Sequence, residues 1–371
     1  MIPSESLPYA IALSQMKGMS RQVAEKLLQS CGDLNTLFNE SPESWREILG
    51  ITAPLFDEAS REKALSAADT EMAFIEERGI TPLFFTDMDY PARLHECPDA
   101  PVMLYFKGNG SLNPHRILSI VGTRKATRYG RDFCADLLGQ LSHSVPGLTI
   151  VSGMAYGIDI CAHREALKNN LPTIGVLAHG LHTLYPSVHR TTAREAEQNG
   201  GLLTEYTSQQ PILKINFVAR NRIVAGMTEA TLVIESPEKG GALITAHLAR
   251  DYNREVFALP GNINQECSTG CNRLIRDNVA ALVTSAEDII ETMGWETSTR
   301  PDVKQQPSLF PEVSEKESVL LQILHDRGEQ QINQLTVAAN LPAGEILSTL
   351  LEMEFKGLVR TLPGGMFCAT K

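Results

Sequence analysis

The sequence has few of the features that mark an exported, membrane-spanning or disulfide-linked protein. Its seven cysteines are an odd number and are mostly scattered, so a reducing compartment is expected rather than a disulfide framework. No uninterrupted apolar run approaches the roughly twenty residues needed to span a bilayer. The N-terminal stretch also lacks the basic start, apolar centre and cleavage site of a signal peptide. We therefore expect a cytoplasmic protein with no membrane partner.

An excess of positive charge is also missing. The chain has 33 lysines and arginines against 44 aspartates and glutamates, a formal net charge of −11. This excludes a protein that is basic over its whole surface, but a local basic stripe is enough to bind nucleic acid. The length of 371 residues allows two or three domains, one with a sizeable core.

Several cofactor and catalytic motifs are absent. The turn at Gly122 is not G-x-G-x-x-G, so no dinucleotide site is predicted. Cys267 and Cys271 have no second Cys or His pair at zinc spacing, and no serine lies in a G-x-S-x-G elbow. Asp159 and His163 are expected to cap and pack a helix rather than bind a metal. We expect no cofactor, no metal and no catalytic residue, and hence a protein that is not an enzyme.

Apolar strand-like runs alternate with helical stretches between about residues 116 and 295. The runs are continuous in Val, Ile and Leu, as in parallel strands that are buried on both faces. This predicts an α/β fold with a Rossmann-like, doubly wound, mostly parallel sheet. The expected strands are Ile117–Val121, Thr149–Val151, Thr173–Leu177, Leu202–Thr204, Thr231–Ile234, Glu255–Ala258 and Ala281–Val283.

Two smaller regions precede the expected sheet. Residues 1–80 have helical spacing, and a Gly-containing hairpin at Leu13–Ser20 predicts a helix–hairpin–helix or SAM-like domain. Such a domain either offers backbone N–H groups to DNA phosphates or serves only for packing, and the sequence leaves both open. The Pro-rich stretch Tyr90–Gly108 is expected to be a connector that ends in an edge strand. The Rossmann-like domain is placed at residues 81–295.

A polar, Pro-containing linker at residues 296–315 is followed by an expected winged-helix domain at residues 316–371. Acidic residues outnumber basic ones on its presumed recognition helix, so an auxiliary or protein–protein role is favoured over duplex binding. The expected elements are helices at Glu317–His325, Ile332–Ala339 and Ala343–Lys356, and a hairpin of Leu358–Arg360 and Met366–Cys368.

Three Gly-containing turns lie between a strand run and a helix in the α/β region. They are Ile120–Gly130, Val151–Asp159 and Lys239–Thr245. Such turns direct backbone N–H groups and the positive end of a helix at a ligand, usually a phosphate. Because the strands are parallel, the three turns are expected to meet at one edge of the sheet, where open α/β sheets bind ligands.

Cations accompany these turns. Arg124 follows the first strand, and a guanidinium suits phosphate oxygens or a base plane. Arg220 is expected to face a polyanion, whereas Arg222 either does the same or pairs with Glu205 or Glu235. The candidate nucleic-acid-binding residues are Gly122, Thr123, Arg124, Arg128, Ser152, Gly153, Phe217, Arg220, Asn221, Arg222, Lys239, Gly240, Gly241 and Thr245.

Several long motifs, in order, resemble the DNA-processing protein A family (DprA, also called Smf). They are V-G-[ST]-R at Val121–Arg124, S-G-x-A-x-G-I-D-x-x-A-H at Ser152–His163, F-x-x-R-N-R-I-x-x-G at Phe217–Gly226 and K-x-G-x-L-I-T-A at Lys239–Ala246. The chain departs from the family pattern at Tyr156, which replaces a basic residue. It also has Gly240-Gly241 in place of Ser-Gly, and Asn278-Val279 in place of Gly-Ala.

The resemblance implies a protein that protects incoming single-stranded DNA and loads the recombinase RecA onto it during natural transformation. It implies a homodimer through the Rossmann-like domain. By the same resemblance, Arg124 holds a phosphate or stacks on a base, and Arg220 and Lys239 meet backbone phosphates. The backbones at Gly153, Gly240 and Gly241 would approach the DNA closely.

Two other functions share features with this sequence. A nucleotide-binding hydrolase similar to the lysine-decarboxylase-like phosphoribohydrolases would share a related core. Its P-G-G-x-G-T-x-x-E run, however, is not reproduced at Pro237–Gly241 or at Pro260–Asn262. A transcription regulator built around the winged helix is disfavoured by the low basicity of that region.

Overall fold

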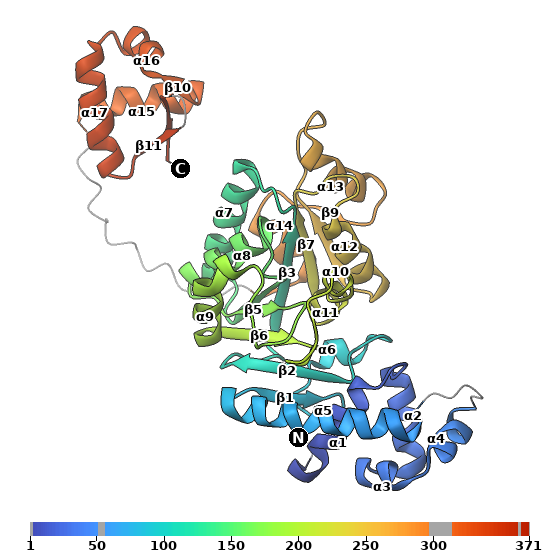
Figure 1. Ribbon diagram of the computed structural model, residues 1–371. Coiled ribbons are helices and arrows are strands. Elements are labelled where there is room, and N and C mark those ends of the chain that lie inside the picture. The colour runs from blue at the N-terminus through green and yellow to red at the C-terminus, as the bar shows by residue number, and fades with distance from the viewer. Residues whose placement is uncertain (1–2, 51–55, 297–313, 363–364, 371) are drawn as a thin grey trace. The chain divides into compact units, whose positions relative to one another are not determined.

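The computed structural model describes residues 3–50, 56–296, 314–362 and 365–370. The chain forms two compact units, Met1–Ser298 and Thr299–Lys371 (Figure 1). Most of the expected linker at residues 296–315 lies outside the described residues. The separation of residues 1–80 from 81–295 as two domains stays a prediction, because both lie in the first unit.

A nine-stranded sheet forms the centre of the first unit, in the order β1-β2-β6-β5-β4-β3-β7-β8-β9. All neighbours from β6 to β9 pair in parallel, whereas β2 is antiparallel to both β1 and β6. The predicted mostly parallel α/β sheet is therefore confirmed. The strands are β1 (Thr81–Phe84), β2 (Met103–Gly108), β3 (Arg116–Gly122), β4 (Leu148–Ser152), β5 (Thr173–Val176), β6 (Gly200–Thr204), β7 (Ala230–Ile234), β8 (Glu255–Ala258) and β9 (Ala281–Leu282).

Helices cover both faces of this sheet. Alternate residues of β3 divide between two cores: Ile117 and Val121 join one, and Leu118 and Ile120 join the other. The first core includes α11 (Asn221–Gly226), α12 (Gly241–Asp251) and α13 (Glu266–Arg276), and the second includes α7 (Arg128–Ser144), α8 (Ile158–Lys168) and α14 (Ala286–Met293). Apolar residues on both sides explain why the strands are continuous in Val, Ile and Leu. The other helices of this region are α6 (Ala92–His95), η2 (Ser187–His189), α9 (Arg190–Gln198) and α10 (Lys214–Ala219).

Within the parallel part of the sheet, from β3 to β9, the chain changes direction once. From β3 it passes outward through β4 and β5 to β6, and then returns to place β7 on the other side of β3. The carboxyl ends of β3 and β7 therefore border a topological switch point, the place where doubly wound sheets open a crevice.

The structure corrects one expectation at the other end of the sheet. The strand predicted as an edge, β2, is an interior strand, since it pairs with β1 on one side and with β6 on the other. Its residues Met103–Phe106 are all buried, as an interior strand requires. The edge is β1, which was not predicted; its four residues include Pro82, a residue that edge strands tolerate.

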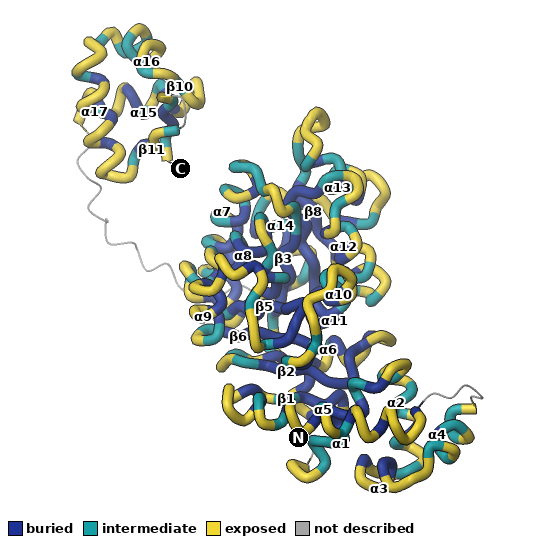
Figure 2. The backbone as a smooth tube through the Cα atoms, in the orientation of Figure 1, coloured by how far each residue is buried: buried dark blue, intermediate teal, exposed yellow. Residues whose placement is uncertain are grey.

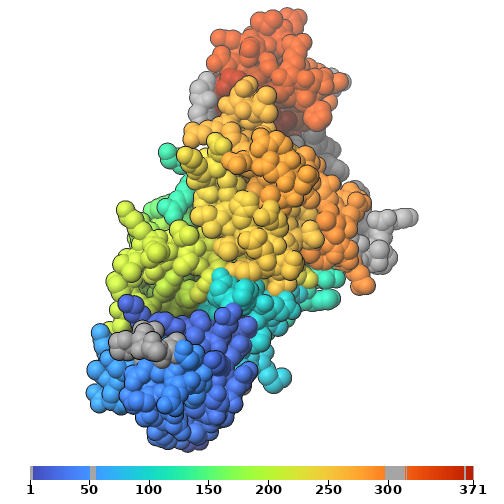
Figure 3. All heavy atoms as spheres, turned by 90° about the vertical axis from the view of Figure 1, so that its right-hand side faces the viewer, coloured from blue at the N-terminus to red at the C-terminus, as the bar shows by residue number. Residues whose placement is uncertain are grey.

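The N-terminal helices are confirmed and share a core with the sheet; buried segments lie on both sides of their junction in Figure 2, and Figure 3 shows this region packed directly against the next part of the chain. The cluster that contains Ile11, Leu27 and Trp45 also contains Leu104 of β2. The carboxylate Oε2 of Glu71 accepts hydrogen bonds from the backbone N–H and the hydroxyl of Ser208. The elements are η1 (Ser4–Ser6), α1 (Leu7–Gln15), α2 (Arg21–Cys31), α3 (Leu34–Asn39), α4 (Pro42–Leu49) and α5 (Glu58–Arg78).

The second unit has the predicted winged-helix architecture. Its elements are α15 (Glu315–Arg327), β10 (Gln330–Gln331), α16 (Ile332–Ala339), α17 (Ala343–Phe355), β11 (Val359–Leu362) and β12 (Met366–Ala369). The three strands form a small sheet in the order β10-β12-β11, of which β10 was not predicted. Leu320, Leu335 and Leu350 come from the three helices and meet in its core.

Candidate nucleic-acid interface

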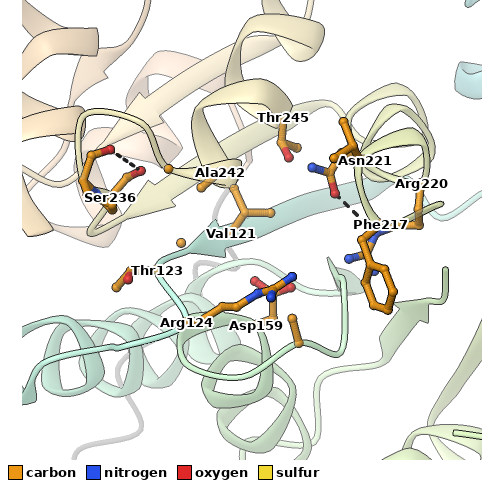
Figure 4. Close-up of a pocket in the computed structure, with 16 residues that line it drawn as sticks. Val121, Thr123, Arg124, Asp159, Phe217, Arg220, Asn221, Ser236, Ala242 and Thr245 are labelled. Atoms are coloured by element: carbon orange, nitrogen blue, oxygen red, sulfur yellow. Dashed lines mark hydrogen bonds between the residues drawn. The ribbon is translucent and has the colours of Figure 1, made fainter. Parts of the chain in front are cut away.

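A cavity of about 270 Å³ opens at the carboxyl ends of β3 and β7 (Figure 4). Its wall includes Val121–Arg124 at the carboxyl end of β3, Asp159 at the start of α8, Arg220 and Asn221 at the junction of α10 and α11, and the turn from β7 into α12. Strands β4, β3 and β7 are neighbours in the sheet, so the three Gly-containing turns meet at one edge, as expected.

The N-terminus of α12 is open to this cavity. Its N-cap is Gly240, which has no side chain to accept a hydrogen bond. Gly241 and Ala242 line the cavity, and their backbone N–H groups donate to no group within the described part of the chain. Unpaired N–H groups at the positive end of a helix dipole are a binding site for an anion.

The N-terminus of α7 is not open to an external anion, because a side chain of the protein already caps it. The buried carboxylate of Glu235 accepts hydrogen bonds from the Thr127 backbone N–H, at 2.8 Å, and from the Thr127 hydroxyl. Gly130 allows this approach, because a Cβ there would lie 2.5 Å from Glu235 Oε2. The structure thus corrects the expectation that the first turn offers its helix end to a ligand, since an internal anion already occupies it.

The N-terminus of α8 also makes internal contacts with groups of the protein itself. The Ile158 N–H donates to the carbonyl of Thr123. Burial raises the pKa of Asp159, an effect that the nearby Arg220 opposes. The backbone N–H groups of Ala155 and Gly153 also act to lower the pKa of the Asp159 carboxyl. Of the three helix ends at this edge, α12 is therefore the one that faces the cavity with unpaired donors.

Arg124 is the exposed cation of the cavity. Its side chain extends beside Asp159 in Figure 4 and lines the same cavity as the N-terminus of α12. Within the described residues its guanidinium makes no ion pair or hydrogen bond. Gly122 brings the strand close to its neighbours, because a Cβ there would lie 2.0 Å from the carbonyl oxygen of Ile234. The cavity thus combines an exposed guanidinium with a helix N-terminus, both suited to an anion.

Arg220 lies at the back of the cavity and is 4% exposed. Its Nη1 donates to the carbonyls of Gly153, at 2.6 Å, and of Val176, and its Nε donates to Asn221 Oδ1. Burial lowers its pKa, while Asp159 opposes this effect. Arg220 therefore adds positive charge to the cavity from within the protein, whereas the sequence favoured a residue that faces the polyanion directly.

Five of the predicted residues lie outside the cavity lining: Arg128, Ser152, Gly153, Arg222 and Lys239. Arg222 makes a bidentate ion pair with Glu205, with Nη–Oε distances of 2.9 and 2.6 Å. Pairing with Glu205 was one of the alternatives expected for this residue. Arg128 pairs with Asp132 one helical turn later. The hydroxyl of Ser152 is buried and donates to the carbonyl of Ile120 at 2.6 Å. These contacts stabilise the fold around the cavity.

Lys239 lies next to the cavity rather than in it. Its side chain is exposed and lines a neighbouring hollow of about 340 Å³, on the outer side of α12. Gly240 borders both cavities. Lys239 therefore reaches a ligand only if that ligand extends past the N-terminus of α12.

Apolar and aromatic groups form another part of the cavity wall. Phe217 and Val218 belong to the cavity wall, and the Phe217 ring packs edge-on against Tyr185, with 5.7 Å between ring centroids. Tyr185 is exposed, so this ring pair offers a surface on which a base can stack. The predicted Thr245 also lines the cavity.

Sequence reasoning missed Asp159 as a wall residue and Glu235 as the cap of α7. Both are carboxylates near the start of a helix and at the carboxyl edge of the sheet, and that placement was the signal available. Among the residues that the structure describes, no group of three His, Cys, Asp or Glu side chains could hold a metal ion. No described helix is long and apolar enough to cross a bilayer.

Comparisons with known proteins agree with this architecture. The family described as DNA recombination-mediator protein A matches residues 81–294, and the DprA winged helix domain matches residues 304–365. Protein Smf of Escherichia coli is 35% identical over 283 residues, which cover 74% of each chain. Protein Smf of Synechocystis is 32% identical, over 96% of this chain and 97% of its own.

Two solved structures are similar to this chain. DNA processing protein A of Streptococcus pneumoniae aligns with a TM-score of 0.66 and 32% identity, over 76% of this chain and 97% of its own. DNA processing protein A of Helicobacter pylori, described for its single-stranded DNA binding mode, aligns with a TM-score of 0.52 and 30% identity. That alignment covers 58% of this chain and 95% of the other.

Proposed function

Because the chain belongs to the family of DNA recombination-mediator protein A (DprA, also called Smf), we propose that it binds single-stranded DNA at the cavity beside β3 and β7. The observation that carries this proposal is the meeting of Arg124 with the unpaired N–H groups of α12 in one cavity. One phosphate of the strand is held between them.

The neighbouring groups suit an unpaired strand better than a duplex. The rings of Phe217 and Tyr185 stack on bases that are not paired, a contribution of roughly 1–3 kcal/mol per base that does not depend on sequence. Lys239 meets a phosphate further along the backbone, where the strand passes the N-terminus of α12. The Helicobacter pylori protein, described for single-stranded DNA binding, supports this choice of ligand.

Binding alone accounts for this function, with no covalent step. The described lining of the cavity has neither histidine nor cysteine. We propose further that the protein protects incoming single-stranded DNA and loads RecA onto it during natural transformation, and that it acts as a homodimer through the Rossmann-like domain. The family is described as a recombination mediator, which supports the proposed role with RecA.

A binding experiment tests the proposal. Fluorescence anisotropy is measured with labelled oligo-dT and duplex DNA over a salt series, and binding of AMP is measured by calorimetry. We expect oligo-dT to bind far more tightly than the duplex, with an affinity that falls as salt rises. Preference for AMP, with release of the free base, would instead support the phosphoribohydrolase alternative.

A further inference from the structure

An exposed aromatic ring lies beside the cavity, outside the lining described above. Tyr156 follows Ala155, which lines the cavity, and is 48% exposed. Its ring packs edge-on against His189, with 5.0 Å between the ring centroids. His189 is buried and immediately precedes α9. This contact therefore holds the tyrosine ring between the edge of the cavity and the start of α9.

Two arginines lie around the same histidine. Arg190 follows it as the first residue of α9. Arg164 belongs to α8, which lies beside α9 (Figure 1), and its Nε donates to the hydroxyl of Thr192 at 3.4 Å. Burial, and then the charge of Arg164, lower the pKa of His189. Both arginines are exposed, and within the described ranges neither has an ion-pair partner. We call Tyr156, Arg164 and Arg190 the α9 rim.

The carboxylates of α8 and α9 do not neutralise these two arginines. Glu165 and Glu197 pair with lysines, at 3.4 and 3.2 Å. Glu195 is exposed, but Arg194 beside it in α9 offsets its charge. Arg190 also lies at the positive end of the α9 dipole, in a first turn that has no acidic residue. A cation in that position is unfavourable unless an anion lies nearby, so the α9 rim is suited to a negatively charged ligand.

The order of the strands places the α9 rim in line with the cavity. Along the carboxyl edge of the sheet, α9 follows β5, Tyr156 follows β4, Arg124 follows β3 and Lys239 follows β7. These four strands are consecutive neighbours, in the order β5-β4-β3-β7. At roughly 4.8 Å between neighbouring strands, their carboxyl ends span about 14 Å. A few nucleotides of a single strand cover that length.

We infer that a bound single strand leaves the cavity along this edge towards β5, with one base stacked on Tyr156 and neighbouring phosphates bound by Arg164 and Arg190. This inference rests on the proposed binding of single-stranded DNA and adds three residues to that site. An exposed ring beside two guanidiniums suits a nucleotide, because unpaired bases stack on aromatic rings and guanidiniums bind phosphates. An acidic peptide would use the arginines but would leave the ring without a partner.

The charges are tested with the full-length protein and labelled oligo-dT of about 20 nucleotides, longer than the site. Anisotropy gives the affinity over a salt series. Arg164→Ala/Arg190→Ala is expected to make the slope of log affinity against log salt shallower by about 1.4, which is two phosphates at about 0.7 each. Lys168→Ala is the control, because it removes an exposed cation at the other end of α8. It should leave the slope unchanged.

The ring is tested separately from the charges. Tyr156→Ala is expected to weaken oligo-dT binding by about tenfold, with the salt slope unchanged. Tyr156→Phe keeps the ring, so its affinity should stay within about twofold of the wild type. Equal affinities of Tyr156→Ala and the wild type would refute stacking at this position.

Arg124→Ala, measured in parallel, separates this inference from the proposed function. If Arg124→Ala reduces the slope while neither Tyr156→Ala nor Arg164→Ala/Arg190→Ala changes binding, the strand does not follow this edge and the inference is wrong. If none of these variants changes binding, the proposed site fails as well. Poly-glutamate that binds the wild type but not Arg164→Ala/Arg190→Ala, with oligo-dT binding unaffected, would assign the α9 rim to an acidic protein and overturn the inference.

Discussion

The guanidinium of Arg220 occupies the space that a side chain on residue 153 would need. A Cβ at Gly153 would lie 2.5 Å from Nη1 and Nη2 of Arg220, while Nη1 donates to the Gly153 carbonyl at 2.6 Å. The glycine after β4 and the buried arginine before α11 therefore depend on each other, although 67 residues separate them.

This relationship predicts the effect of Gly153→Ala. The added methyl group must displace the guanidinium from the carbonyls of Gly153 and Val176, so we expect a loss of about 1–3 kcal/mol in the free energy of unfolding. Urea denaturation measures this loss. Gly139→Ala is the matched control: a Cβ at Gly139, in α7, would have no neighbour nearer than 4.0 Å. If both variants were equally stable, the role of Gly153 in seating Arg220 would be refuted.

Arg222→Ala separates stability from DNA binding. It leaves the Glu205 carboxylate without its bidentate partner, in a pair whose side chains are only 19% and 17% exposed. Loss of one member of such a pair leaves a poorly solvated charge, so we expect a destabilisation of about 2–3 kcal/mol. The salt dependence of oligo-dT binding should stay as in the wild type, because Arg222 is outside the cavity lining. A reduced salt dependence would place Arg222 in the interface instead.

A pH dependence follows from His163 in α8. Burial, and then the charge of Arg220, lower the pKa of His163 to about 3, whereas an unfolded histidine titrates near 6.5. Between these values the unfolded chain binds the additional proton, so stability falls as the pH falls from 6.5 towards 3. His163→Leu should remove this part of the slope, up to about 1.4 kcal/mol per pH unit. Urea denaturation between pH 4 and 7 measures it, and identical slopes would contradict the assignment.

The strands of the α/β region and their mostly parallel direction could be predicted from the sequence, because continuous apolar runs reflect burial on both faces. Glu255–Ala258 and Ile332–Ala339 were predicted with the bounds that the structure has. The edge strand was not, since pairing depends on which distant segment arrives beside β2. Thr81–Phe84 is too short to carry a pattern of its own, and Pro82 weakens the pattern further.

The candidate site was predictable in part. The parallel strands predicted that Arg124 and the Gly240–Gly241 turn lie at the same edge of the sheet. The structure places them in one cavity. What the sequence could not settle was how each buried charge is compensated. The guanidinium of Arg220 donates hydrogen bonds to the carbonyls of Gly153 and Val176. The N-terminus of α7 is capped by the carboxylate of Glu235. These partners follow or belong to strands that are far apart in the chain.

The contribution of Arg124 to the salt dependence tests the account most directly. Oligo-dT affinity is measured from low to high salt for wild type, Arg124→Ala and the control Arg250→Ala, which changes an exposed arginine at the far end of α12. If Arg124 holds one phosphate, the slope of log affinity against log salt should become shallower by about 0.7 in Arg124→Ala alone. An unchanged slope for Arg124→Ala, or an equal change in Arg250→Ala, would contradict a single-stranded DNA site in this cavity.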